Sequence, residues 1–296
     1  MYVSEYYVSS HITGFFVPWF NDDYLKTGSM GAGVSLSKGV RTKVKVSKGN
    51  GLVNIFVNGI KTPNDKVPVT LNCIDILKER YNGLSKNMDL IIEHENNVPI
   101  EAGFGASASA VLGVCFSLRD LLSISPEDCI RIAHETEVRS LSGLGDVIAE
   151  VKGGIEIRKT PGVDGIVENI PFEQNLKVLG ICLGSKKTES ILKDPNKLKI
   201  IEKCGTKLLK KLITEPTVGK MMECSKTFTY KTNILTKEIL DIIDRITEIN
   251  SFNAAGIMIG QGVFTFVNEE DEKKVLDLLK DIKGKIVISP IAKGLL

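Results

Sequence analysis

The sequence has little net charge and no long apolar run. Its 296 residues carry a formal net charge of only +2, which is too little to indicate a nucleic acid or a membrane surface as the main partner. The apolar stretches stay well short of the ~20 residues that are needed to cross a bilayer. The aromatic N-terminus contains Glu5 and lacks a basic segment, so we interpret it as a strand and loop rather than a signal peptide. We therefore expect a cytoplasmic location.

Patterns for disulfides and transition metals are also missing. The three histidines form neither an HxH nor an HExxH motif, which argues against a transition-metal site. No two cysteines form a CxxC pair, so we expect reduced, buried thiols. The cysteines are Cys73, Cys115, Cys129, Cys182, Cys204 and Cys224.

The sequence does contain enough apolar residues for a sizeable core. With 43% apolar and 25% charged residues, its length suggests about two domains. Alternating residues predict a β-rich first third, with a hairpin over 33–59 and a strand over 88–95. Helical spacing predicts helices over 67–80, 107–122 and 126–142, followed by strand-like material over 146–158. A second domain is expected to contain strands over 176–184 and 285–291, a hairpin over 254–267, and helices over 196–213, 217–229, 235–250 and 271–282.

A glycine-rich turn, "GFGASA" over 103–108, precedes the apolar helix. The chain has no GxxxxGK[ST], so it is not an ordinary P-loop NTPase. The turn fits the GxGxxA fingerprint of dinucleotide-binding Rossmann folds, but the preceding strand ends near Glu95 and the upstream region is hairpin-like rather than βαβ. Gly103 and Gly105 would let backbone N–H groups approach a polyphosphate, and the helix start adds a positive dipole end. Close packing of small residues against a neighbouring helix is the alternative.

Acidic side chains in and after the helix over 126–142 have different surroundings. Arg131, Glu135 and Arg139 recur every four residues, which predicts a solvated charge stripe. Glu137 falls on the apolar side, where a carboxylate is rare unless it meets a cation, a metal ion or a hydrogen-bond donor. A structural salt bridge is the alternative for Glu137, and a core histidine is the alternative for its neighbour His134.

Two further charged residues follow this helix. Asp146 stands in "SGLGD", behind two glycines, where a simple turn aspartate is the alternative to a catalytic role. Arg158 alternates with Ile155 and Ile157, so it is either a binding residue or a surface charge on a strand.

Together these pieces resemble the GHMP small-molecule kinases. The second motif of that superfamily, roughly P-x3-G-L-G-S-S-A, matches Pro99 followed by "GFGASASA". The metal-binding serine of the family corresponds to Ser107, its magnesium-binding glutamate to Glu137 in "AHETE", and its catalytic aspartate to Asp146. A glycine-rich turn, "GIMIGQG" over 256–262, loosely represents the third motif.

The N-terminal segment narrows the resemblance. "HITGFF", then "GSMGAG" and "GVRT", is similar to the archaeal pantoate kinases, which make 4-phosphopantoate on the archaeal route to coenzyme A. His11 stands where many superfamily members have a basic residue. The resemblance implies an α+β fold of two domains, with an ATP-binding, β-rich α/β domain over 1–165 and a ferredoxin-like α+β domain over 166–296.

The resemblance also implies a set of site residues for ATP, Mg²⁺ and pantoate. Asp146 would orient the acceptor hydroxyl and accept its proton, while Ser107 and Glu137 would hold Mg²⁺. Arg158 suits the pantoate carboxylate, with further candidates at His134, Ser29, His11, Lys26, Arg139 and Lys186. The residues expected to contact the ATP phosphates are Gly103, Gly105, Ala106, Ser107, Ala108 and Ser109.

Three alternatives remain open from the sequence. The acceptor could be another hydroxy acid or polyol such as mevalonate, homoserine or shikimate, because acceptor pockets vary within one fold. An NAD(P)-dependent oxidoreductase could use the GxGxxA turn, and a non-catalytic binding module could keep the fold. The oligomeric state is not readable, and a homodimer is one option.

Overall fold

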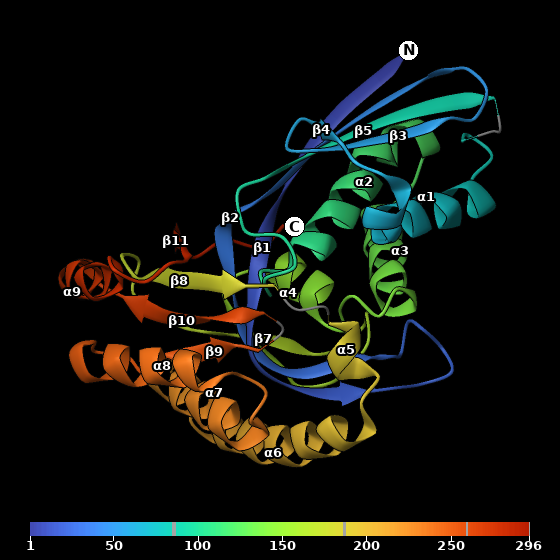
Figure 1. The fold of residues 1–296 in the computed structure, drawn as a ribbon. Coiled ribbons are helices and arrows are strands. Elements are labelled where there is room, and N and C mark those ends of the chain that lie inside the picture. The colour runs from blue at the N-terminus through green and yellow to red at the C-terminus, as the bar shows by residue number, and fades with distance from the viewer. Residues whose placement is uncertain (85–86, 186–187, 259, 296) are drawn as a thin grey trace.

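The computed structural model describes residues 1–84, 87–185, 188–258 and 260–295, and it contains two β-sheets with helices packed against them (Figure 1). The first sheet has seven strands and belongs to the N-terminal half, whereas the second has four strands. The strands are β1 (Tyr2–Trp19), β2 (Gly28–Lys48), β3 (Val53–Val57), β4 (Ile60–Lys61), β5 (Met88–Asn96), β6 (Ile155–Arg158), β7 (Val167–Ile170), β8 (Lys177–Gly184), β9 (Ala255–Ile257), β10 (Gln261–Val267) and β11 (Lys285–Pro290). The helices are α1 (Pro68–Arg80), α2 (Ala106–Leu122), α3 (Pro126–Arg139), α4 (Asp146–Lys152), α5 (Glu189–Leu192), α6 (Pro195–Thr214), α7 (Val218–Thr232), α8 (Lys237–Ile249) and α9 (Glu269–Leu279), with a short 3₁₀ turn η1 (Asn64–Lys66).

Two long strands organise the first sheet. Strands β1 and β2 pair antiparallel along almost their whole length, and the sheet continues from β2 through β5, β3 and β4 on one part and through β6 and β7 on another. Register shifts between Ser9 and Ser10 and between Thr13 and Phe15 interrupt the β1–β2 ladder. Such irregularities change the direction of side chains locally, and these two lie on either side of His11.

Helix α2 is the central helix of this half. It is buried along most of its length and packs against both long strands, as expected for a helix that is apolar nearly all round. Helix α3 begins as predicted, because the Ser125 hydroxyl accepts a hydrogen bond from the Asp128 N–H and Pro126 occupies the first turn.

The strand-like assignment over 146–158 was wrong in its first half. Residues 146–152 form α4, whose buried face carries Val147, Ala149 and Glu150 in a helical rather than an alternating pattern. The helix ends at Gly153, whose φ of +67° is a conformation that glycine adopts without steric cost. Strand β6 follows after Gly154. Asp146 consequently starts a helix instead of sitting in an open turn.

The second sheet has the order β11–β8–β10–β9, and all of its pairs are antiparallel. Figure 1 shows helices α6 to α9 gathered on the C-terminal half of the molecule, and α6 and α7 also contact β1. The two halves share one large apolar cluster that includes Phe15 and Phe104 from the first half and Phe264 from the second. The structure is therefore an α+β fold with two sheets.

The division between residues 165 and 166 stays a prediction. Strand β7, over 167–170, still pairs with β6 in the first sheet, and the second sheet begins only with β8. The six cysteines are free thiols, and among the described residues no helix has both the length and the apolar character that crossing a membrane requires.

Candidate active site

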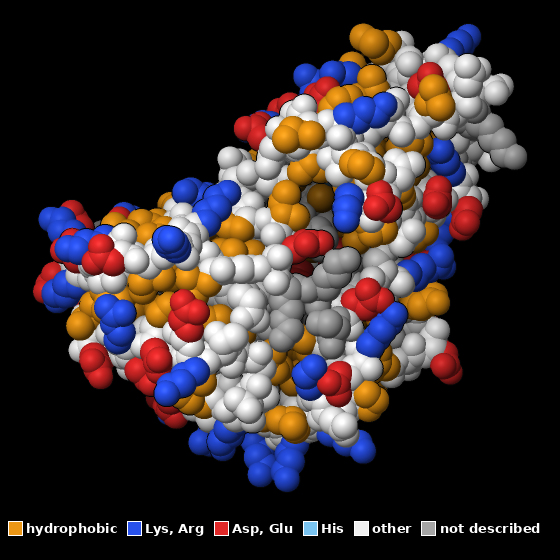
Figure 2. Space-filling view, viewed as in Figure 1, with side chains coloured by type: hydrophobic (Ala, Val, Ile, Leu, Met, Phe, Trp, Pro, Cys, Tyr) orange, Lys and Arg blue, Asp and Glu red, His pale blue; other side chains and the backbone are white. Residues whose placement is uncertain are grey.

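The glycine-rich turn borders a large hollow in the described part of the protein. Gly103 and Gly105 have φ values of +77° and +67°, and Gly105 caps α2 without a side-chain hydrogen bond, so the first N–H groups of the helix have no side-chain cap. The cavity measures about 380 Å³, and Ser107 lies on its wall together with both glycines. In Figure 2 the surface is hollowed near the centre of the view, between the elongated N-terminal lobe and the C-terminal lobe.

The third glycine-rich segment packs against this turn. A Cβ on Gly260 would collide with the carbonyl oxygen of Ala102 and lie 3.1 Å from the Gly103 nitrogen. Met258 also lines the cavity. Ile259, in the same motif, lies outside the described residues. The loosely matched "GIMIGQG" segment thus adjoins the phosphate-loop candidate, although Gly103 and Gly260 are 157 positions apart in sequence.

Glu137 and Ser107 form an oxygen-rich pair. Glu137 is 2% exposed, and its Oε1 accepts a hydrogen bond from the Ser142 hydroxyl at 2.8 Å. Burial, with a smaller contribution from Asp146, raises the pKa of Glu137 to about 7, although hydrogen bonds from Ser142 and Ser107 oppose the shift. Its Oε2 has no hydrogen-bond partner in the described part of the chain.

Gly143 lies beside the carboxylates of both Glu137 and Asp146, and its lack of a side chain leaves space between them. A Cβ on Gly143 would collide with Glu137 Oε2 and would lie 2.9 Å from Asp146 Oδ2, so both carboxylates face the same point. Hard oxygen ligands of this kind suit Mg²⁺, which takes few protein ligands and completes its shell with phosphate oxygens and water. The described residues contain no group of three His, Cys, Asp or Glu arranged as metal ligands.

Asp146 sits on the cavity wall and is held by two side chains of β1. Its Oδ1 lies 2.8 Å from His11 Nδ1 and 3.4 Å from the Thr13 hydroxyl. Burial alone would raise the pKa of Asp146, but the hydrogen bond and charge of His11, with the charge of Arg158, lower it below its usual value. Asp146 is therefore an ionised acceptor at neutral pH.

Arg158 is buried rather than exposed. It is 2% exposed, because both faces of β6 are covered, so the surface-charge alternative was wrong. Its NH1 pairs with Glu156, while Nε and NH2 have no partner among the described residues. A Cβ on Gly145 would lie 2.8 Å from Arg158 Nε and 2.5 Å from the Ser29 hydroxyl, which brings these two groups to one place.

A second, smaller hollow of about 20 Å³ adjoins this place. It shares Thr13, Asp146 and Thr188 with the larger cavity. Its other walls are Phe16, Ser29, Leu144, Gly145 and Leu192. The general-base candidate therefore lies where the two hollows meet.

Several predicted site residues lie away from the cavity walls. His134 is buried against the backbone, with Nε2 2.8 Å from the Thr27 carbonyl oxygen, and burial lowers its pKa, as expected for a core histidine. Ala108 and Ser109 are buried behind the turn, where the Ser109 hydroxyl bonds to Glu150 Oε1 at 3.0 Å. Lys26 is largely exposed near Asp23, and Lys186 lies outside the described residues.

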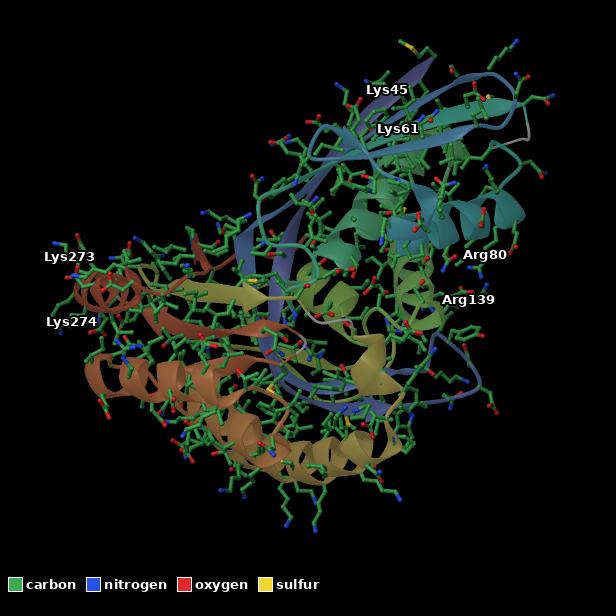
Figure 3. The ribbon with its side chains drawn as sticks, in the orientation of Figure 1. Lys45, Lys61, Arg80, Arg139, Lys273 and Lys274 are labelled. Carbon is green, nitrogen blue, oxygen red and sulfur yellow. The ribbon has the colours of Figure 1, made fainter. Side chains whose placement is uncertain are left out.

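The predicted solvated stripe on α3 is only partly exposed. The Glu135 side chain is 6% exposed and pairs with Arg80 at 2.7 Å and Arg139 at 2.6 Å. Figure 3 shows the labelled Arg80 and Arg139 side by side, coming from α1 and α3. Glu135 is therefore the buried carboxylate of structural ion pairs, because α1 packs against the side of α3 that the sequence predicted to face solvent.

Two buried carboxylates were missed by the sequence analysis. Glu156 is fully buried and faces His11 and Arg158, and Glu150 is buried below the glycine turn, where burial raises its pKa well above the usual value. The only signal in the sequence was their alternation with apolar residues, which resembles that of an ordinary strand or helix face.

Comparison with known proteins identifies the family of the chain. The family described as "GHMP kinases N terminal domain" matches residues 69–154. A pantoate kinase of Thermococcus kodakarensis is 34% identical, with 93% of this chain and 91% of the relative covered. A pantoate kinase of Methanocaldococcus jannaschii is 31% identical, with 93% of this chain and 97% of the relative covered.

The chain belongs to the GHMP kinase superfamily.

Solved structures give the same family fold. A protein described as a phosphotransferase related to the CoA biosynthesis pathway superposes with a TM-score of 0.88 at 32% identity, covering 98% of this chain and 96% of that chain. A homoserine kinase from Cytophaga hutchinsonii reaches a TM-score of 0.70 at 13% identity, covering 99% of this chain and 96% of that one, so it supports the fold alone. The predictions of a GHMP kinase and an α+β fold are thereby confirmed.

Proposed function

We propose that this protein is an ATP-dependent kinase that phosphorylates the 4-hydroxyl group of pantoate, in the biosynthesis of coenzyme A. Support comes from two sources: archaeal pantoate kinases resemble the chain over nearly its full length, and the buried groups suit this acceptor. The observation that carries the proposal is that Asp146 lines both hollows. The larger hollow also contains the glycine turn, and the smaller one is lined by Gly145, beside which the unpaired Nε of Arg158 lies.

The chemistry of pantoate matches the junction of the two hollows. Pantoate has a carboxylate at one end, a primary hydroxyl at the other and a dimethyl-substituted carbon between them. The free Nε and NH2 of Arg158, with the Ser29 hydroxyl, would bind the carboxylate through paired charge-assisted hydrogen bonds. Phe16, Leu144 and Leu192 offer apolar contacts for the methyl groups.

Asp146 would orient the attacking hydroxyl. The acceptor oxygen attacks the γ-phosphorus, the bond from that phosphorus to the bridging oxygen breaks, and the hydroxyl proton passes to the Asp146 carboxylate. A carboxylate with a lowered pKa is a weak base, which suits phosphoryl transfer because positioning and charge stabilisation contribute most to the rate. The N–H groups of the turn over 103–107 would hold the phosphates.

The oxygens of Glu137 and Ser107 fit a magnesium ion, because Glu137 Oε2 is buried without a partner among the described residues and faces the open space at Gly143. When bound, Mg²⁺ would neutralise charge on the transferring phosphoryl group. The large cavity also has apolar walls at Val57, Val69 and Ile100, and these would contact the adenine base. A cytoplasmic location and a homodimer remain expectations.

An acceptor panel tests the proposal. The protein is assayed with ATP and Mg²⁺ against pantoate, mevalonate, homoserine and shikimate, and ADP release is measured. We expect turnover with pantoate at the highest kcat/KM. Turnover of another acceptor, with none of pantoate, would identify a GHMP kinase of different specificity, and stabilisation by NADH but not by ATP would favour the oxidoreductase alternative.

Asp146→Asn is the matched variant for this assay. The amide keeps the shape of the carboxylate but cannot accept the proton, so kcat should fall by roughly 100-fold or more. The affinity for ATP should stay within about twofold, because the phosphates contact the glycine turn rather than this side chain. Unchanged turnover would remove Asp146 from the chemistry.

A further inference from the structure

We infer that Glu156 is a positioning residue that couples the general base to the carboxylate-binding arginine, through one buried oxygen shared by His11 and Arg158. The inference rests on the proposed function for the role of Arg158 and Asp146, but not for the contacts themselves. Glu156 is fully buried, and its Oε1 lies 3.1 Å from His11 Nε2 and also pairs with Arg158 NH1.

On one side, Glu156 fixes the imidazole behind Asp146. His11 has a carboxylate at each ring nitrogen, Asp146 at Nδ1 and Glu156 at Nε2. An ionised carboxylate only accepts hydrogen bonds, so both nitrogens donate when His11 is an imidazolium. Although burial lowers the pKa of His11, the two carboxylates more than offset this and raise it. The imidazolium then holds Asp146 in an orientation in which its other oxygen is free for the acceptor.

On the other side, Glu156 orients the guanidinium. It pairs with NH1 of Arg158, which leaves Nε and NH2 without a partner among the described residues, and Nε lies beside Gly145, near the Ser29 hydroxyl. Because the guanidinium is planar and rigid, an ion pair at one nitrogen restricts the directions that its remaining donors can take. The same glutamate therefore sets the direction of both groups that contact the acceptor.

Sheet geometry makes this contact specific. His11 lies on β1 and Glu156 on β6, with β2 between them, so the side chains start two strand spacings apart, or roughly 10 Å. Glu156 pairs with Gly33 of β2, and a Cβ on Gly33 would collide with His11 Nε2. The imidazole reaches Glu156 across a strand position that has no side chain.

The buried cluster is balanced in formal charge. Around His11, the facing ionisable groups are Asp146 and Glu150 from α4 and Glu156 and Arg158 from β6. Burial raises the pKa of Glu150 well above the usual value, which keeps it neutral. Two carboxylates then oppose two cations, and removal of Glu156 leaves an excess positive charge and two displaced donors.

The experiment compares Glu156→Gln with Glu135→Gln, a matched control in which a buried, arginine-paired glutamate is changed outside the site. For Glu156→Gln we expect kcat/KM for pantoate to fall by roughly 100-fold, with both a higher KM and a lower kcat, because displaced reacting groups cost about this much. The Kd for ATP should stay within about twofold. Glu135→Gln should leave all three constants near the wild-type values.

A spectroscopic measurement separates this inference from the identity of the acceptor. The chain has only three histidines, so imidazole NMR signals can be assigned with a His11→Asn variant. The His11 titration midpoint should move to lower pH in Glu156→Gln, and Gly33→Ala, which disturbs the same contact from β2, should move it in the same direction. An unchanged midpoint in both variants overturns the inference, as does wild-type kcat and KM in Glu156→Gln.

Other outcomes are equally decisive. If Glu156→Gln does not fold, Glu156→Asp keeps the charge on a shorter side chain, and it should fold with an intermediate loss of kcat/KM. Wild-type kinetics in that variant would overturn the inference. If the wild-type protein phosphorylates a different acceptor, the proposed function fails, whereas a shifted His11 midpoint and a reduced kcat with that acceptor still support the role of Glu156.

Discussion

The replacement Glu137→Gln should make the protein more stable and inactive at the same time. Glu137 is 2% exposed, it is ionised only against the cost of burial, and one of its oxygens has no partner among the described residues. A glutamine has nearly the same shape and never ionises. The variant therefore removes an unfavourable buried charge that we expect to serve only when a metal ion is bound.

The size of the effect follows from the pKa. Burial raises the pKa of Glu137 from 4.5 to about 7, and each pKa unit corresponds to about 1.4 kcal/mol, which gives about 3 kcal/mol for the full shift. Below pH 4.5 the group is neutral in both the folded and the unfolded state, and it contributes nothing. Between pH 4.5 and 7 the folded state binds more protons than the unfolded state, so stability falls as the pH rises. Above pH 7 the whole cost is present.

Urea unfolding of both proteins without metal or nucleotide measures the difference. The free energies of unfolding of Glu137→Gln and the wild type should agree near pH 4.5 and separate as the pH rises, until the variant is about 3 kcal/mol more stable at pH 8.5. Adding Mg²⁺ and ATP should stabilise the wild type more than the variant, because ligands that bind the folded state raise its stability.

Glu135→Gln provides the control, because its carboxylate is buried but paired with Arg80 and Arg139. This change should lower the free energy of unfolding by about 1 kcal/mol, since both arginines are partly exposed and the pairs are screened. The reasoning is refuted if Glu137→Gln is less stable than the wild type at pH 8.5, or if the difference does not depend on pH.

Three further predictions concern single contacts. Gly143→Ala should lower kcat by roughly 100-fold, because its Cβ would occupy the space between Glu137 Oε2 and Asp146 Oδ2, and a magnesium titration of activity measures this. Gly105→Ala should raise the KM for ATP and destabilise the protein by about 1 to 2 kcal/mol, because the backbone is left-handed there and the Cβ would lie 2.6 Å from Glu150 Oε1. Steady-state kinetics measure the KM, and urea unfolding measures the stability. Arg158→Lys should raise the KM for pantoate by about tenfold or more while the KM for ATP is kept, because an ammonium cannot form the paired hydrogen bonds of a guanidinium.

Local patterns allowed the phosphate turn and the buried acid to be predicted. The turn over 103–107 was readable because glycines and small residues precede an apolar helix, and the structure gives both glycines positive φ values. Glu137 was readable because helical periodicity placed a carboxylate on an apolar face. The roles of these residues in binding ATP and Mg²⁺ stay predictions.

Errors arose where tertiary contacts override a local pattern. The segment over 146–152 has few residues and mixed periodicity, so strand and helix could not be separated before its packing on β1 and α3 was known. Glu135 was assigned to a solvated stripe from its spacing on the helix. The assignment failed because α1, which comes from elsewhere in the chain, covers this side chain. Neither fact is present in the local sequence.

The convergence of His11, Glu156 and Arg158 could not be predicted from the sequence for a different reason. His11 on β1 and Glu156 on β6 are 145 positions apart in sequence, and their register depends on β2 and on the irregular pairing near Ser9 and Thr13. A shift of one residue would turn His11 to the opposite face of the sheet. Sequence alternation gives the two faces of a strand, but it does not say which residues of another strand share them.

Three glycines outside the glycine-rich turn mark places where side chains of the site converge. Gly33, Gly143 and Gly145 each occupy a point at which a Cβ would collide with, or crowd, the polar groups that meet there: His11, the two carboxylates, and Ser29 with Arg158. None of the three has a positive φ, so backbone conformation alone does not require glycine at these positions. At Gly143 and Gly145 the neighbouring atoms are side-chain atoms of the site, whereas at Gly33 the backbone oxygen of Ile12 also excludes a Cβ. In this chain three glycines whose φ values do not require glycine lie beside Asp146 and its partners.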